Sequence, residues 1–271
     1  MNSKSVMTLT YGDRAEAHVG MEIHGVGAVE GYSVDEVHDF HRHLKHEYDI
    51  NSTIEMMEHL DQHAALLIIP NGVDQILAQC SKSGFTYQDL YNEQLALEPL
   101  YDRHALMKGR VVNKHARWNT VFDDISAEPD YINAKSRVTA FNDVRVTSEL
   151  RHVWSQLFGA KANNLKCEGN YYYDPSKCGI GYHGDSERKI VIGIRLGATM
   201  PLCFAWYHRF QQVGYTYRYE LNGGDIYVMS EKAVGHDWRK SSQYTLRHAA
   251  GCDKYTQHQK LINKKRCINE M

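Results

Sequence analysis

The second half of the chain alternates short apolar runs with breaks that contain Gly or Pro, and this pattern predicts β-strands. One strong helix precedes them, with Thr147 as its N-cap and Gly159 as its stop. Many short strands after a helical part are typical of a sandwich or barrel with flanking helices. The apolar face of that helix is Leu150, Val153, Trp154, Leu157 and Phe158, and the predicted strands are 170–173, 189–196, 201–207, 215–221, 225–229 and 243–249.

The first part of the chain, up to residue 110, shows mainly helical signals. Two capping-box patterns occur, at Ser33 with Glu36 and at Ser52 with Glu55, and each precedes apolar residues at helical spacing. Residues 1–31 have no clean period. We therefore expect residues 1–110 to form a mainly helical region that packs on a core made by residues 111–271. Its other predicted elements are helices at 73–80 and 87–95 and one buried strand at 64–69.

Composition narrows the class of protein. The 271 residues are 42% hydrophobic and 24% charged, which is ordinary for a globular chain that builds a core. The net charge of -2 does not favour a strongly electrostatic nucleic-acid binder. Because the chain has no long apolar run and no secretion signal pattern, we expect a soluble intracellular protein without a membrane span. Its six cysteines form no Cys-x-x-Cys pair, so they are expected to be reduced thiols.

The candidate chemistry begins at His183-Gly184-Asp185. Residues i and i+2 of an extended backbone project from the same face, so one imidazole and one carboxylate can bind a single divalent ion. This pair is one residue short of the 2-His-1-carboxylate triad that suits non-haem Fe(II) with open coordination positions. Glu187, Arg188 and Trp238 flank the expected ligands in sequence, and they are candidates either for substrate contact or for rim packing.

The third ligand is expected on a strand or loop well downstream, and we predict His236, which follows the strand at 225–229. His208 lies too close to His183 for a strand pair to intervene, and His248 is the remaining alternative. Arg247 follows in a predicted strand. Because a buried guanidinium is costly unless it meets an anion, and because its planar fork suits a carboxylate, we predict that Arg247 anchors a dicarboxylate. The competing interpretation is that Arg247 pairs with a protein carboxylate.

In this order and spacing the motifs resemble those of the AlkB-like Fe(II)/2-oxoglutarate dioxygenases, over about residues 165–251. Asn170-Tyr171-Tyr172 resembles the Asn-x-Tyr motif of that family, and the His183–Asp185 motif with its acidic follow-on resembles the family's His-x-Asp segment. The stretch 224–229 is similar to the Gly-Asp strand that leads to the distal histidine. Thr245-Leu246-Arg247 resembles the closing Thr-x-Arg. The chain departs from the family at Ser241, where a second arginine is typical.

The resemblance implies an α+β fold, a double-stranded β-helix (jelly roll) with supporting helices, mostly from the N-terminal half. It implies Fe(II), 2-oxoglutarate and O2 as cofactors, with His183, Asp185 and His236 as metal ligands and catalytic residues. Asn170, Tyr172 and Arg247 would then bind 2-oxoglutarate. The implied oxidoreductase activity is oxidation of a C–H bond, by hydroxylation or oxidative demethylation, coupled to conversion of 2-oxoglutarate to succinate and CO2.

Three interpretations of function remain open at this stage. The first is a dioxygenase that acts on a modified nucleobase. The second is a hydroxylase of a small molecule or a protein side chain on the same scaffold, which the near-neutral charge and the unfamiliar N-terminal half favour. The third is a non-catalytic jelly-roll binding module, against which the complete set of expected ligands argues.

Overall fold

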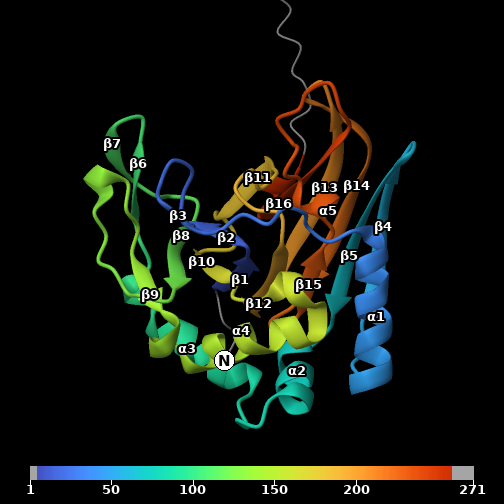
Figure 1. Cartoon of the computed structure of the whole chain (residues 1–271). Coiled ribbons are helices and arrows are strands. Elements are labelled where there is room, and N and C mark those ends of the chain that lie inside the picture. The colour runs from blue at the N-terminus through green and yellow to red at the C-terminus, as the bar shows by residue number, and fades with distance from the viewer. Residues whose placement is uncertain (1–4, 258–271) are drawn as a thin grey trace, which may run out of the picture.

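The computed structural model of this protein describes residues 5–257. The fold is α+β, and antiparallel β-sheets dominate it while helices are few (Figure 1). No helix within the described range is both long and apolar enough to cross a membrane.

The largest element is an eight-stranded sheet, which is antiparallel except where its last two strands pair in parallel. The N-terminal strand β1 lies near its centre, where it pairs with β12 on one side and β10 on the other. In spatial order the strands are β4 (Thr53–His59), β5 (Gln62–Ile69), β15 (Ile226–Met229), β12 (Val191–Gly197), β1 (Val6–Gly12), β10 (Lys166–Tyr172), β8 (Trp118–Asp123) and β9 (Val138–Ala140).

A four-stranded antiparallel sheet packs against one face of the large sheet. Apolar side chains from both sheets form one cluster between them, with Val6, Val191 and Met229 from the large sheet and Phe204 and Leu246 from the small one. In spatial order the small sheet contains β11 (Gly179–His183), β16 (Thr245–Gly251), β13 (Met200–His208) and β14 (Gln211–Leu221). Two short hairpins complete the strands, β2 (Arg14–Glu16) with β3 (Ile23–Gly25), and β6 (His104–Met107) with β7 (Arg110–Asn113).

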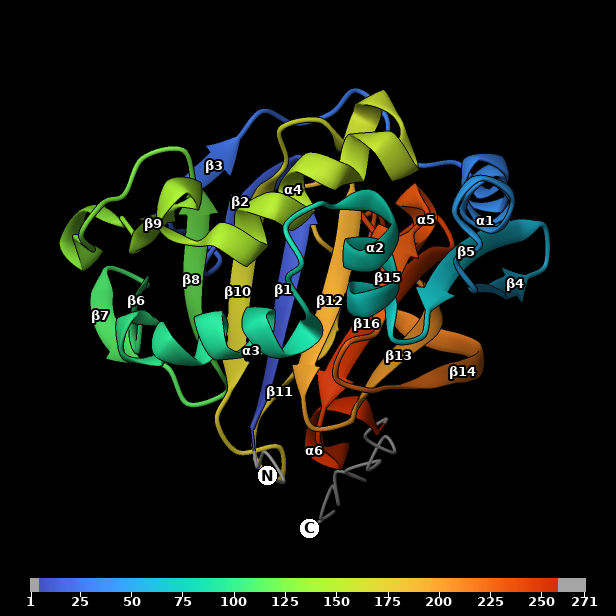
Figure 2. The same cartoon turned by 90° about the horizontal axis from the view of Figure 1, so that it is seen from below.

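The long helices cover the opposite face of the large sheet. Figure 2 shows α2, α3 and α4 lying across its strands. Met7, Leu9 and Tyr11 of β1 point toward these helices and join the second and larger apolar cluster. The helices are α1 (Val34–Tyr48), α2 (Gly72–Cys80), α3 (Tyr87–Ala96), α4 (Arg145–Phe158), α5 (Glu231–Val234) and α6 (Asp253–Thr256), with 3-10 turns at Glu98–Leu100, Tyr131–Asn133, Phe141–Asp143 and Ala160–Ala162.

Several predicted elements are present with the expected local chemistry. Ser33 caps α1, and its side chain and that of Glu36 exchange hydrogen bonds with each other's backbone N–H as a capping box requires. The predicted apolar face of α4 is buried, and the helix ends at Gly159, whose φ is 75°. Thr147 does not cap this helix, which begins two residues earlier at Arg145.

The expectation of a mainly helical region over residues 1–110 is wrong. The segment after Ser52 forms strand β4, which pairs with β5 along its whole length, so its apolar residues serve a sheet and not a helix. Residues 6–12 form β1, where Thr8 and Thr10 alternate with the apolar residues that face the helices. Because β1 is hydrogen-bonded to strands on both sides, the N-terminal region is part of the core and does not merely pack on it.

Candidate metal centre

A cavity of about 750 Å³ lies between the two sheets and opens beside the β2–β3 hairpin. Side chains on the inner faces of β1, β10, β12 and β15 form its large-sheet wall. Side chains from β11, β13 and β16, together with the loop after β11, form the other wall. The lining includes Thr8, Thr10, Arg14, Glu16, His18, Arg117, Glu168, Asn170, Tyr172, His183, Asp185, Glu187, Arg188, Arg195, Tyr227, Trp238, Arg239 and His248.

Two histidines and one carboxylate converge on the wall of this cavity. One ligand atom from each of His183, Asp185 and His248 lies within 4.8 Å of the others. Asp185 Oδ1 is 3.4 Å from His183 Nε2 and 3.5 Å from His248 Nε2. Within residues 5–257 this is the one group of three such side chains close enough to share a metal ion.

Strand pairing brings these histidines together. His183 ends β11 and lies opposite His248 in β16, although the register shifts by an irregularity after Ile180. Paired residues of neighbouring strands project from the same face, so both imidazoles point into the cavity. Tyr182, the residue before His183, packs instead against Tyr207 on the outer face of the small sheet.

The hydrogen bonds of His183 leave its second nitrogen available as a ligand. Its Nδ1 lies 2.9 Å from the Gly181 carbonyl oxygen and 3.1 Å from that of His248. A proton on Nδ1 that is donated to a carbonyl fixes the tautomer in which Nε2 presents its lone pair. Burial and the neighbouring His248 lower the pKa of His183, so the neutral imidazole that a metal requires is favoured.

Arg188 binds the outer oxygen of Asp185. Its Nε is 3.5 Å from Asp185 Oδ2, while its Nη2 lies 2.5 Å from Glu168 and 2.8 Å from Glu187. Burial opposes the ionisation of Asp185, but the charges of Arg188 and His248 hold its pKa well below the usual range. The carboxylate is therefore ionised, with Oδ2 on Arg188 and Oδ1 directed at the two histidines.

The residue between the two N-terminal ligands has to be a glycine. A Cβ on Gly184 would lie 2.0 Å from the Gly235 carbonyl oxygen and 2.8 Å from Trp238 Cβ. The turn after α5 therefore packs directly on the His-x-Asp segment, and the Asp185 N–H donates to the Val234 carbonyl oxygen at 3.1 Å. This contact sets the backbone from which His183 and Asp185 project.

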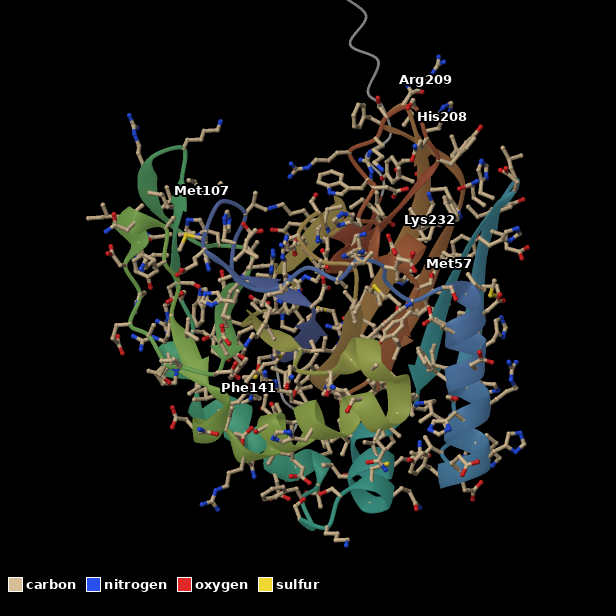
Figure 3. All side chains as sticks on the ribbon, viewed as in Figure 1. Met57, Met107, Phe141, His208, Arg209 and Lys232 are labelled. Carbon is tan, nitrogen blue, oxygen red and sulfur yellow. The ribbon has the colours of Figure 1, made fainter. Side chains whose placement is uncertain are left out.

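The predicted third ligand, His236, is not part of the group. It lies in the turn after α5, and its Nδ1 is 3.1 Å from the Arg188 carbonyl oxygen. His208, the nearer alternative, ends β13 beside Arg209 at the tip of the β13–β14 hairpin (Figure 3). The histidine that completes the group is His248 of β16, the strand that pairs with β11 in the small sheet.

Arg247 does not line the cavity, contrary to expectation. Neighbouring residues of a strand point to opposite faces, so His248 in the cavity places Arg247 outside it. There its Cζ lies 4.1 Å from the ring centroid of Tyr207, 5.2 Å from Trp238 and 5.6 Å from Phe210. Among the described residues Arg247 forms no ion pair with a carboxylate, and three aromatic rings surround its guanidinium.

The predicted cosubstrate ligands Asn170 and Tyr172 do face the cavity, but they differ in availability. Asn170 Oδ1 accepts hydrogen bonds from Arg117 and Asn119, both at 2.6 Å, and its Nδ2 donates to Glu168 at 3.0 Å. Asn170 is thus committed to a polar network on β8 and β10. Tyr172 lies two residues further along β10, on the same face of the strand, opposite Val6 of β1.

Sequence reasoning missed Arg195, the most deeply buried of the strand arginines that line the cavity. It is 1% exposed, and its neighbours Ile194 and Leu196 face the helices while it faces inward. Its Nη1 donates to Thr8 Oγ1 at 2.6 Å, and its buried Nε has no hydrogen-bond partner among the described residues. The sequence feature that could have identified it is a single arginine within the otherwise apolar strand β12.

The mouth of the cavity carries mixed charges and one large ring. Trp238 lines it beside the metal ligands, and its Nε1 donates to Ser186 Oγ at 2.8 Å. Glu16 comes from the β2–β3 hairpin, and burial together with the charges of Glu187 and Glu168 raises its pKa to about 7. A ligand that enters from this side meets carboxylates, arginines and an indole.

Comparison with known proteins gives the family. No family model matches the chain. The chain is 43% identical over 259 residues to a protein of Acanthamoeba polyphaga mimivirus that bears the name "Uncharacterized protein R156". The alignment covers 93% of this chain and 98% of the viral protein, so the chain belongs to the same family as that mimivirus protein.

Proposed function

We propose that this protein is an Fe(II)- and 2-oxoglutarate-dependent dioxygenase of AlkB-like type, an oxidoreductase that oxidises a C–H bond. The observation that carries the proposal is the convergence of His183, Asp185 and His248 on the wall of a cavity large enough for two small ligands. The arrangement of two facing antiparallel sheets supports a double-stranded β-helix, in which β1 is the strand between β10 and β12.

The donor set fits the metal. Two imidazole nitrogens and one carboxylate oxygen are the ligands of the 2-His-1-carboxylate triad, and the group includes no thiolate that would favour a softer ion. Iron bound there would supply O2 activation coupled to oxidative decarboxylation of 2-oxoglutarate. The three side chains come from one wall, so the remaining coordination positions would face the cavity.

The chain itself supplies orientation and a partly dry environment. Arg188 holds Asp185 in position, and the carbonyl oxygens that accept from His183 fix its ring. Apolar side chains such as Val191, Leu202 and Met229 line the same cavity and limit the water beside the reacting atoms. Trp238 and the charged residues at the mouth are in place to contact the primary substrate.

The triad also bears on the rival interpretation of a non-catalytic binding module. A binding module has no need for two imidazoles and a carboxylate whose ligand atoms lie within 4.8 Å of one another beside one cavity. The mixed charge of the mouth supports either a modified nucleobase or a small molecule or protein side chain as the substrate.

Release of succinate from 2-oxoglutarate tests the proposal. The Fe(II)-loaded protein should release it under air, and the rate should rise with the correct member of a panel of methylated oligonucleotides, nucleosides and amino acids. Asp185→Ala should abolish turnover while the variant stays folded. Full turnover by Asp185→Ala, or no succinate with any substrate or in uncoupled reaction, would contradict the proposal.

A further inference from the structure

The wall of the cavity contains a buried cation, Arg195, that forms no ion pair in the described part of the chain. The Arg195 side chain projects from β12 into the cavity that the metal ligands line, and the residue is almost completely buried. Its Nη1 binds a hydroxyl group, and its Nε binds nothing within residues 5–257. None of the ion pairs formed by the described residues includes Arg195, in contrast to Arg188, which contacts three carboxylates.

Such an arrangement is costly for a protein without a ligand. A buried guanidinium loses its hydration, and a neutral hydroxyl partner returns only part of that free energy. Arg247 in the small sheet also has a buried Nε without a hydrogen-bond partner among the described residues, but three aromatic rings lie around its guanidinium. In the part of the chain that the structure describes, Arg195 has neither an ion pair nor a ring stacked on its guanidinium, and it lies beside Thr8 in the cavity wall.

The neighbours of Arg195 on the cavity wall are neutral hydrogen-bonding groups. Thr8 lies directly across from it on β1, and Tyr172 and Tyr227 line the same cavity. Tyr227 packs on Gly193, where a Cβ would lie 2.0 Å from the tyrosine ring, so glycine at that position lets the ring lie flat on the sheet. Hydroxyl groups around one guanidinium form a pocket that suits a carboxylate and that a cation would not enter.

We propose that Arg195 and Thr8 bind the distal carboxylate of a dicarboxylate whose other end lies at the His183–Asp185–His248 group. For 2-oxoglutarate this deepens the proposed function, on which it rests, and assigns the anion anchor to β12 instead of the strand that carries Arg247. The guanidinium fork pairs with both oxygens of a carboxylate, which a lysine could not reproduce.

A matched pair of ligands isolates the contact. 2-Oxobutyrate is 2-oxoglutarate without its distal carboxylate, so the difference in their affinities for the Mn(II)-loaded full-length protein measures what that carboxylate gains. Wild type should bind 2-oxoglutarate roughly 100-fold more tightly or better, because truncating one partner of a buried charge pair has effects of that order. Calorimetric titration gives both dissociation constants without any turnover.

Arg195→Met should reduce the affinity for 2-oxoglutarate to that for 2-oxobutyrate and leave the latter unchanged. Arg247→Met, on the opposite face of the small sheet, is the matched control and should keep the full difference between the two ligands. Arg195→Lys should recover part of the difference. Without ligand, Arg195→Met should melt at the same temperature as wild type or higher, because it removes an unpaired buried charge.

Each possible outcome decides the assignment. If Arg195→Met keeps the preference for 2-oxoglutarate, or if Arg247→Met loses it, Arg195 is not the anchor. If Arg195→Met does not fold, Arg195→Lys provides the test. An unchanged ratio of the affinities for 2-oxoglutarate and 2-oxobutyrate in that variant would show that the guanidinium does not bind the distal carboxylate. If neither ligand binds the Mn(II) protein at all, the proposed function fails; if both bind equally well to wild type, only the anchor fails.

Discussion

His248 lies directly across from His183 in the β11–β16 pair, and their ring centroids are 4.5 Å apart. This one relationship determines the candidate site. It places both imidazoles beside Asp185 Oδ1, and it places Arg247, the neighbour of His248 in sequence, on the other face of the sheet. The candidate metal centre therefore joins the end of β11 and the loop after it to β16, a strand far away in the chain.

Replacing His248 should cost more metal affinity than replacing His236. His248→Ala removes one of three proposed ligands and should weaken Mn(II) binding by roughly 100-fold or more. This is beyond the effect typical of replacing a residue that only hydrogen-bonds to a ligand. His236→Ala removes a ring that faces a backbone carbonyl oxygen and should change affinity little. Titration of Mn(II) followed by its electron paramagnetic resonance signal measures both, and a reversed order of effects would restore His236 as the ligand.

The positive charge of Arg188 should stabilise the folded protein, because three carboxylates surround it. Arg188→Met leaves Asp185, Glu168 and Glu187 without their shared cation, and breaking such a buried pair costs about 3–5 kcal/mol of unfolding free energy. Urea denaturation at pH 7 measures this loss, and Arg239→Met, an exposed arginine at the same cavity mouth, serves as the control. Equal stability of the two variants would show that the carboxylates do not depend on Arg188.

The packing of α5 on the ligand segment gives a matched pair of glycine variants. In Gly184→Ala the new methyl group meets the Gly235 carbonyl oxygen, and overpacking of this kind typically costs about 1–3 kcal/mol. Gly181→Ala, in the same strand region, meets nothing within 4 Å and should be nearly neutral. The melting temperature and the affinity for Mn(II) should both fall in Gly184→Ala and stay unchanged in Gly181→Ala. If neither variant changes them, the turn after α5 does not position the ligand segment.

Glu16 should make stability depend on pH. Its pKa is raised to about 7 from an ordinary value of 4.5, so the folded state binds a proton more tightly than the unfolded state does. The contribution of this group is complete below pH 4.5 and is lost as the pH rises through about 7. Glu16→Gln should therefore melt higher than wild type at pH 8 and equally at pH 4, whereas Glu30→Gln, exposed near the same hairpin, should show no such difference. A pH-independent effect of Glu16→Gln would refute this origin.

The periodicity of the sequence predicted much of the local structure. The capping box at Ser33, the apolar face of α4, strand β10 and the strands from β12 to β16 follow from short-range chemistry, and the structure has them close to the expected residues. The Ser52–Glu55 capping pattern favours a helix after it, but the structure has strand β4 there. β1 was missed although Thr8 and Thr10 alternate with Met7, Leu9 and Tyr11, a pattern that favours a half-buried strand.

The sequence by itself determined that His183 and Asp185 share a face, because their spacing on an extended backbone requires it. It could not determine which later histidine joins them, since that depends on which strand lies beside β11. Nor could it determine that Arg195 faces the cavity while Arg247 does not, because both occupy strands and a strand has two faces. Sheet pairing decided both questions: the hydrogen-bonded register of β16 with β11 selected His248, and the insertion of β1 beside β12 placed Thr8 against Arg195. Such pairings join residues distant in the chain, so only the tertiary structure shows them.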